Sequence, residues 1–134
     1  CAVTLAVRAA SMKAAEQVAA HIRSLDAQAQ VEVMDIEQLD GSQAYELMIN
    51  ATPVGMYPNV QHSPVDEQAL RSVKTLFDCI YNPGTTLLMQ QAQQAGCQTI
   101  GGMEMLVWQA AAAQEIWFGR SFSDCQVAQV AAKM

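Results

Sequence analysis

Short apolar runs alternate with segments of helical periodicity along the chain. The runs are compact and end at turn residues or charges, as buried strands do, and they lie at residues 2–7, 31–35, 47–50, 75–81 and 97–100. Apolar residues at helical spacing predict helices at residues 11–25, 66–71, 86–95, 103–118 and from 124 onward. Strands that alternate with helices in this way favour a parallel sheet with helices on both faces.

Residues at the ends of the helical segments support these boundaries. Ser11, Thr85 and Ser123 each precede a helical segment, and their hydroxyls can accept hydrogen bonds from its first free amides. Gly96 and Gly119 follow helical segments and suit the left-handed backbone conformation that often ends a helix. We therefore expect these five residues to act as helix caps and stops.

Composition narrows the class of protein. With 51% apolar residues, the 134 residues can bury one ordinary core, which predicts a single domain over residues 1–134. The net charge of -6, without a basic run, argues against nucleic acid or an anionic membrane as a partner. No apolar stretch approaches the roughly 20 residues of a membrane-spanning helix, and no signal-peptide pattern opens the chain.

The four cysteines are widely spaced and form no C-x-x-C pair. This spacing gives no support to a metal site. Free thiols in a reducing cytoplasm are the better interpretation, so we expect a cytoplasmic protein.

In parallel α/β sheets, ligands bind beyond the carboxyl ends of the strands, so residues at strand ends are the candidates for chemistry. Arg8 follows the first strand, and an arginine there suits the 2′-phosphate of NADP, which a carboxylate would repel. Lys13 could add a second positive charge. From the residue alone, Arg8 could equally well be a solvated strand end.

Other strand ends carry polar residues and turns of low bulk. Residues 50–56, with Thr52 and Pro53, form a turn whose backbone could approach a ligand closely, although connectivity alone would also explain it. Asp78 lies in an apolar strand and should accept hydrogen bonds as a structural residue. Tyr81 and Gln109 offer a phenol and an amide that can bind a hydroxyl or carboxylate.

Three segments together, residues 49–56, residues 77–88 and residues 101–110, resemble the shikimate dehydrogenase family in content, order and separation. That family joins a shikimate-binding domain to a C-terminal Rossmann domain that binds NADP. It reduces 3-dehydroshikimate to shikimate by hydride transfer in chorismate and aromatic amino acid biosynthesis. The resemblance therefore implies an NADP-dependent oxidoreductase.

The resemblance also assigns roles to individual residues. It implies cofactor contacts at Arg8, Lys13, Thr52, Pro53, Cys79, Gly102 and Met105. It implies that Tyr81 and Gln109 line the pocket for shikimate or 3-dehydroshikimate. Ala9 replaces the usual threonine, which removes one hydroxyl contact with NADP.

The family pattern also contains features that we do not find here. Its Gly-rich phosphate turn precedes the strand that matches residues 3–7, and its catalytic Lys and Asp belong to the other domain. We therefore expect a Rossmann-like sheet truncated before its second strand, with no catalytic residue of its own and no activity alone. Treating residues 3–7 as the first Rossmann strand is disfavoured, because residues 8–11 contain no glycine.

In this register the strands at residues 3–7 and 47–50 each lack a neighbour in the order 3-2-1-4-5-6. Open edges invite pairing with another chain, so we expect rearrangement, a homo-oligomer or strand exchange. Two alternatives stay open for the function. One is a quinate/shikimate dehydrogenase, and the other is a non-catalytic, self-associating remnant of a nucleotide-binding domain.

Overall fold

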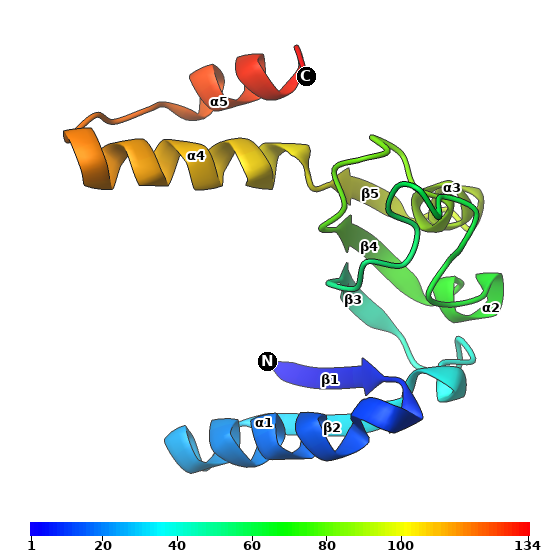
Figure 1. Cartoon of the computed structure of the whole chain (residues 1–134). Helices are drawn as coiled ribbons and strands as arrows, with labels where there is room; N and C mark the ends of the chain where they lie inside the picture. The colour runs from blue at the N-terminus through cyan, green and yellow to red at the C-terminus, as the bar shows by residue number, and fades with distance from the viewer. The chain divides into compact units, whose positions relative to one another are not determined.

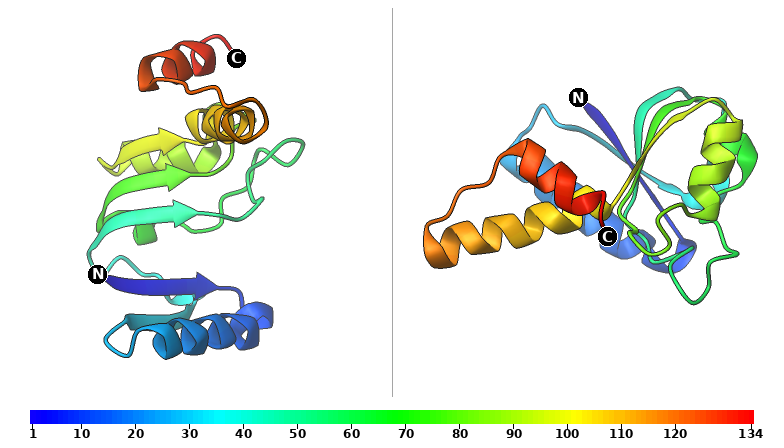
Figure 2. Two further views of the ribbon diagram at one scale, coloured as in Figure 1. Left: turned by 90° about the vertical axis from the view of Figure 1, so that its left-hand side faces the viewer. Right: turned by 90° about the horizontal axis from the view of Figure 1, so that it is seen from above.

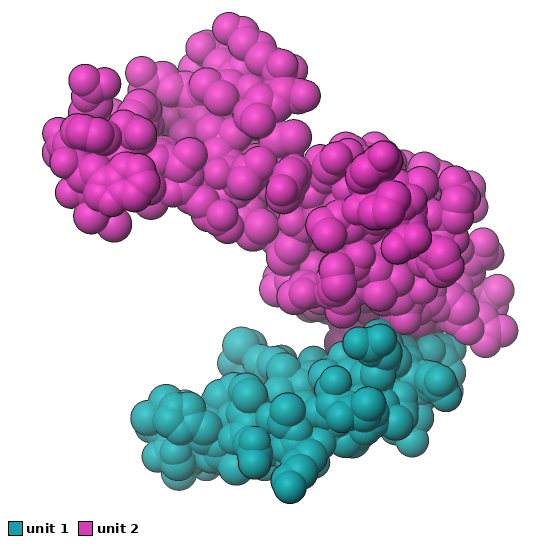
Figure 3. Space-filling view, viewed as in Figure 1, with its two compact units in different colours: residues 1–42 teal, residues 43–134 magenta.

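The computed structural model describes all residues from 1 to 134 and divides into two compact units, residues 1–42 and residues 43–134 (Figure 3). Both units combine helices with parallel strands, which confirms the α/β class predicted from the alternating pattern. None of the helices has both the length and the apolar character needed to cross a membrane.

The first unit is one β-α-β arrangement. Its elements are β1 (Ala2–Val7), η1 (Ala9–Ser11), α1 (Met12–Leu25), β2 (Gln30–Asp35) and η2 (Ile36–Gln38). The two strands pair in parallel, with Val7 opposite Asp35, and α1 packs against both of them. The buried residues of α1 are Ala15 and Ala19, so only short side chains are fully enclosed in this helix.

The second unit contains a three-stranded parallel sheet in the order β3-β4-β5. Its strands are β3 (Tyr45–Asn50), β4 (Val73–Asp78) and β5 (Gln98–Gly101). Asn50, Asp78 and Gly101 are register partners across the sheet, so all three strands end at one edge, where the arrowheads lie side by side (Figure 1). The loops that follow these strand ends carry most of the predicted site residues.

Four helices complete the second unit: α2 (Glu67–Leu70), α3 (Leu87–Gln94), α4 (Met103–Phe118) and α5 (Asp124–Ala131). Helix α3 lies against one face of the sheet and contacts β4, β5 and α2, whereas α5 folds back along α4 (Figures 1 and 2). The opposite sheet face carries Leu47, Ile49 and Ile100, which are 51%, 56% and 49% exposed.

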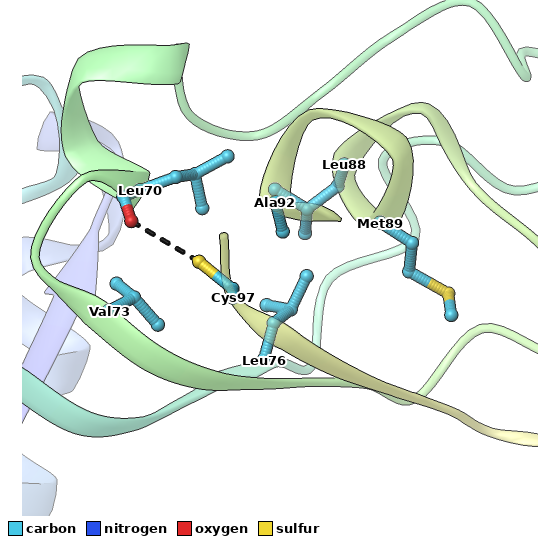
Figure 4. Packing of buried hydrophobic residues seen from close by; sticks show 7 residues of the cluster. All are labelled: Leu70, Val73, Leu76, Leu88, Met89, Ala92 and Cys97. Carbon is cyan, nitrogen blue, oxygen red and sulfur yellow. Dashed lines mark hydrogen bonds between the residues drawn. The ribbon is translucent and has the colours of Figure 1, made fainter. Parts of the chain in front are cut away.

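A compact hydrophobic core joins α2 and α3 to the sheet. It consists of Leu70, Val73, Leu76, Leu88, Met89, Ala92 and Cys97 (Figure 4). The Cys97 thiol donates a hydrogen bond to the Leu70 carbonyl oxygen at 3.3 Å, within this core (Figure 4). Burial away from water disfavours the thiolate and raises the pKa of Cys97.

Two predicted boundaries and one predicted capping hydrogen bond need correction. Strand β4 ends at Asp78 and not at Tyr81, because the Asp78 side chain accepts the Ile80 amide and the chain turns out of the ladder. Thr86, one residue later than predicted, caps α3 by accepting from the Met89 amide. Ser11 occupies the N-cap position of α1, but its side chain makes no capping hydrogen bond.

The other predicted caps are confirmed. Ser123 caps α5 in a capping box with Gln126. Gly96 and Gly119 have positive φ angles of 87° and 64°, as expected for residues that end helices. Strands β1 and β3 each have one strand neighbour only, as predicted for the strands that contain Val3 and Leu47.

Candidate functional site

The site in the second unit begins where β3 and β4 end. Asn50 and Asp78 are 5% and 0% exposed, and the Asn50 Nδ2 donates to Asp78 Oδ1 at 3.0 Å. The Asn50 backbone oxygen accepts from the Cys79 amide at 3.0 Å. Side-chain and backbone hydrogen bonds thus fix the two strand ends to each other.

Asp78 is a fully buried carboxylate whose donors are all neutral. Besides Asn50, its Oδ1 accepts from the Ile80 amide at 3.1 Å, and its Oδ2 accepts from the Thr86 hydroxyl at 2.6 Å. A buried carboxylate needs such partners, because the loss of water would otherwise be very costly. The prediction that Asp78 is a structural hydrogen-bond acceptor is confirmed.

The turn after β3 is fixed by hydrogen bonds to the buried Asn50 side chain, and its outer residues are exposed to solvent. Asn50 Oδ1 accepts from the Thr52 amide at 3.0 Å and from the Thr52 hydroxyl at 2.8 Å. Gly55 has φ of +96°, and an added Cβ would lie 2.9 Å from the His62 carbonyl oxygen, so a glycine is required there. Thr52 and Pro53 are exposed and can meet a ligand.

The loop after β4 carries two of the predicted residues. Cys79 is half-buried and Tyr81 is 44% exposed. The Asn82 carbonyl oxygen accepts from the Tyr57 amide at 3.1 Å, which ties this loop to the one that follows β3. The two loops therefore form a connected surface at the sheet edge.

Gly102 brings the start of α4 against the loop that follows β4. An added Cβ would lie 2.2 Å from the Cys79 carbonyl oxygen, and the Gly102 amide donates to the Ile80 carbonyl oxygen at 3.1 Å. Any side chain at this position would therefore collide with backbone atoms. The preceding Gly101 differs, because its nearest contact would be an ordinary 3.5 Å from the Gly84 carbonyl oxygen.

The structure brings five of the predicted residues into loops at this one edge: Thr52, Pro53, Cys79, Tyr81 and Gly102. Two more, the half-buried Met105 and the exposed Gln109, lie in the first two turns of α4. Sequence reasoning missed Asn50 and Thr86 as partners of Asp78. The available signal was a polar residue at the end of each strand and a threonine just before a helix.

The two predicted cations belong to the first unit. Arg8 is exposed at the end of β1, and its carbonyl oxygen accepts from the Ser11 amide at 2.7 Å. Lys13 is exposed in the first turn of α1. Asp35, opposite Val7 in the sheet, places a carboxylate at the neighbouring strand end, although it lies far from Arg8 along the chain. Its Oδ1 accepts from the Glu37 amide and caps η2.

Parallel strands that end together, followed by turns with glycine at the points of closest approach, define the class as a Rossmann-like α/β domain. The model of the shikimate 5'-dehydrogenase C-terminal domain matches residues 102–123. A 100-residue stretch is 40% identical to the shikimate dehydrogenase (NADP(+)) of Crocosphaera subtropica and covers 72% of this chain and 35% of that protein. The chain belongs to the shikimate dehydrogenase family, as the sequence motifs indicated.

Solved structures agree with this assignment. A shikimate dehydrogenase in complex with NADP+ superimposes with a TM-score of 0.78 at 29% identity, covering 98% of this chain and 46% of that one. A 5-ketofructose reductase of Gluconobacter sp. strain CHM43 gives a TM-score of 0.73 at 30% identity, covering 98% and 47%. The chain spans about a third of the length of the curated relative and about half of each solved chain.

Proposed function

We propose that this chain is the cofactor-binding part of an NADP-dependent shikimate dehydrogenase, which reduces 3-dehydroshikimate to shikimate in chorismate biosynthesis. The observation that carries the proposal is the register of the strand ends. It brings the family-matched residues Thr52, Cys79 and Gly102 to one edge of one sheet. The four cysteines are free, which fits a reducing cytoplasm as the site of action.

The residues at this edge fit a dinucleotide. Thr52 and Pro53 form an exposed turn of low bulk along which the cofactor would lie. Gly102 lets the start of α4 lie directly against the loop that carries Cys79, and Cys79 and Met105 would border the nicotinamide. NADPH, when bound, supplies the hydride for the reduction.

The first unit carries two exposed cations that fit the 2′-phosphate of NADP. A guanidinium offers paired donors to phosphate oxygens, so Arg8 would bind the 2′-phosphate that distinguishes NADP from NAD. Lys13, close along the chain in α1, would add a point charge. We therefore expect the chain to prefer NADPH to NADH.

On the substrate side, the Tyr81 hydroxyl and the Gln109 amide would hydrogen-bond the hydroxyl or carboxylate groups of shikimate. The lysine of β4 cannot serve as an acid or base there. Lys74 lies near the start of the strand and pairs with Glu46 at 2.9 Å, away from the edge that carries the site. We expect the 134-residue chain by itself to bind NADPH without turning over shikimate or quinate.

Calorimetric titration of the 134-residue chain with NADPH and NADH tests the proposal. We expect measurable NADPH binding that weakens about tenfold in Arg8→Ala, from the loss of a charge-assisted contact, whereas NADH binding changes little. Arg120→Ala removes an exposed arginine elsewhere in the chain and is the matched control. Equal affinity of parent and Arg8→Ala for NADPH would refute the role of Arg8.

Thiol labelling gives an independent map of the site. NADPH should slow alkylation of the half-buried Cys79, since this thiol would border the nicotinamide. Cys125 is exposed on α5 and serves as an internal control that NADPH leaves unchanged. If peptide mass mapping showed the same Cys79 labelling rate with and without NADPH, the cofactor would not lie where we place it.

Two observations favour further candidates. The likeness to a 5-ketofructose reductase shows that this fold also occurs in a reductase named for another substrate, so quinate or a related polyol is the alternative to shikimate. The unpaired edges of β1 and β3 favour a self-associating module without catalysis, because such edges pair readily with other strands. Absence of NADPH binding, together with a dimer in light scattering, would support the module.

A further inference from the structure

We propose that Asp78 is a positioning residue of the cofactor site, which holds the turn after β3, the loop after β4 and the start of α4 in one arrangement. The inference deepens the proposed function and rests on it for the identity of the ligand. Asp78 itself is fully buried and would touch neither cofactor nor substrate. It would position the loops of the site through the hydrogen bonds that its two carboxylate oxygens accept.

The first path runs from Asp78 Oδ1 to the turn after β3. Oδ1 accepts from Asn50 Nδ2 at 3.0 Å, which fixes the orientation of the Asn50 amide. The other end of that amide, Oδ1, accepts both the backbone amide and the hydroxyl of Thr52. Rotation of the Asn50 side chain would break these contacts together, so the carboxylate sets the direction of the turn.

The second path runs from the same oxygen to α4. Asp78 Oδ1 also accepts from the Ile80 amide at 3.1 Å, which orients the peptide units just after Cys79. The Ile80 carbonyl oxygen then accepts from Gly102 at 3.1 Å, where the backbones approach too closely for any side chain. The beginning of α4, with Met105, therefore depends on the same carboxylate.

The third path anchors the carboxylate in the core. Asp78 Oδ2 accepts from the Thr86 hydroxyl at 2.6 Å, and the Thr86 oxygen in turn accepts from the Met89 amide as the cap of α3. Thr86 is fully buried, and Met89 belongs to the hydrophobic cluster. Packed residues thus fix the position of Asp78, and Asp78 in turn fixes the exposed loops through its other hydrogen bonds.

Stability alone gives little reason for a buried carboxylate here. Three neutral donors recover part of the lost hydration, and apolar side chains of similar volume often stabilise a core equally well. A fully satisfied polar network instead fixes one geometry for the groups that it joins. Asp78 joins the loops that carry Thr52, Cys79 and Gly102.

Graded variants of the 134-residue chain separate positioning from stability. Asp78→Ala removes every acceptor, whereas Asp78→Asn keeps an oxygen that can accept from Asn50 and Ile80 and loses only the acceptor for Thr86. We expect about tenfold weaker NADPH binding in Asp78→Ala, measured well below the unfolding temperature, and recovery of most of that loss in Asp78→Asn. Thr99→Val, which removes the exposed hydrogen bond to Gln93, is the control and should bind as the parent does.

Backbone amide chemical shifts test the paths without cofactor. Asp78→Ala should shift the amide resonances of Thr52 and Gly102 together, although neither residue touches position 78, and Asp78→Asn should shift them less. Asn50→Ala should shift Thr52 and leave Gly102 in place, because it cuts only the first path. This second variant keeps the test valid if Asp78→Ala does not fold.

The outcomes for Asp78 and for the proposed function differ. If the parent chain binds no NADPH, the proposed function fails, yet the amide shifts still decide the role of Asp78. If the resonances of Thr52 and Gly102 stay unchanged in Asp78→Ala, the positioning role is overturned. The same holds if NADPH affinity in Asp78→Ala stays within twofold of the parent while only the unfolding temperature falls.

Discussion

The two units bury very different material. Helix α1 in the first unit encloses only Ala15 and Ala19, whereas the second unit encloses Leu70, Leu76 and Leu88. The second unit also buries the polar residues Asn50, Asp78 and Thr86. A core that excludes water strengthens such hydrogen bonds, so these three residues can fix the geometry of the loops that they join. A buried polar network of this kind is found in the second unit and not in the first.

The largest difference in stability between the two units should follow from substitutions in the core of the second unit. Leu76→Ala leaves a cavity beneath α3 and should lower the free energy of unfolding by about 2–5 kcal/mol. Leu5→Ala, in the half-buried β1, should cost only about 1 kcal/mol. Hydrogen exchange measured by mass spectrometry assigns each loss to its own unit. Equal losses of protection in both units would contradict the difference that we describe.

The next largest effect on stability should come from Gly102, whose backbone lies against the Cys79 carbonyl. Gly102→Ala places a methyl group against the Cys79 carbonyl, where neither partner is a flexible side chain, and should cost about 3 kcal/mol. Gly101→Ala meets only ordinary contacts and should change stability by less than about 1 kcal/mol. Urea denaturation compares the two. Similar midpoints would show that α4 does not pack this closely against β4.

Helix caps give a smaller contrast between the units. Ser123→Ala removes a capping box from α5 and should cost about 1 kcal/mol of local stability. Ser11→Ala should be nearly neutral, because Ser11 makes no capping hydrogen bond at α1. Amide exchange in the first turn of each helix measures both changes. Faster exchange at α1 in Ser11→Ala would reveal a cap that the structure does not contain.

The thiol in the core predicts the smallest effect, a loss of stability at alkaline pH. Burial raises the pKa of Cys97, so above the ordinary thiol pKa the unfolded chain releases its proton first. The contribution of this residue is therefore complete at neutral pH and declines as pH rises through the folded pKa. Denaturation at several pH values should show this decline in the parent and not in Cys97→Ala. Identical pH profiles would contradict the shift.

The sequence predicted the elements well because their signals are local. The apolar spacing and Gly119 define α4, and Ser123 starts α5 as expected. The end of β4 was misplaced because residues 79–81 are as apolar as the strand itself. The strand ends at Asp78 because the Ile80 amide donates to the Asp78 side chain and not to a neighbouring strand. That bond depends on where the strand end lies, which sequence spacing does not specify.

The candidate site shows the same division. Family motifs located Thr52, Cys79 and Gly102, because turns and glycines leave a mark in the sequence. The pairing of Asn50 with Asp78 joins residues 28 positions apart and depends on strand register. The collision that requires glycine at position 102 likewise depends on the packing of the start of α4 against residues 79 and 80. Long-range contacts of this kind become visible only in three dimensions.

Because the partners of Asp78 are neutral, salt should affect the two units differently. Mobile ions screen exposed charges over distances of about 10 Å at 0.1 M ionic strength, and Arg8 and Lys13 are open to that screening. The hydrogen bonds around Asp78 are enclosed and involve no cation, so added electrolyte leaves them intact. Raising the ionic strength should therefore weaken the attraction of Arg8 and Lys13 for a phosphate group, while the loops around Asp78 keep their arrangement.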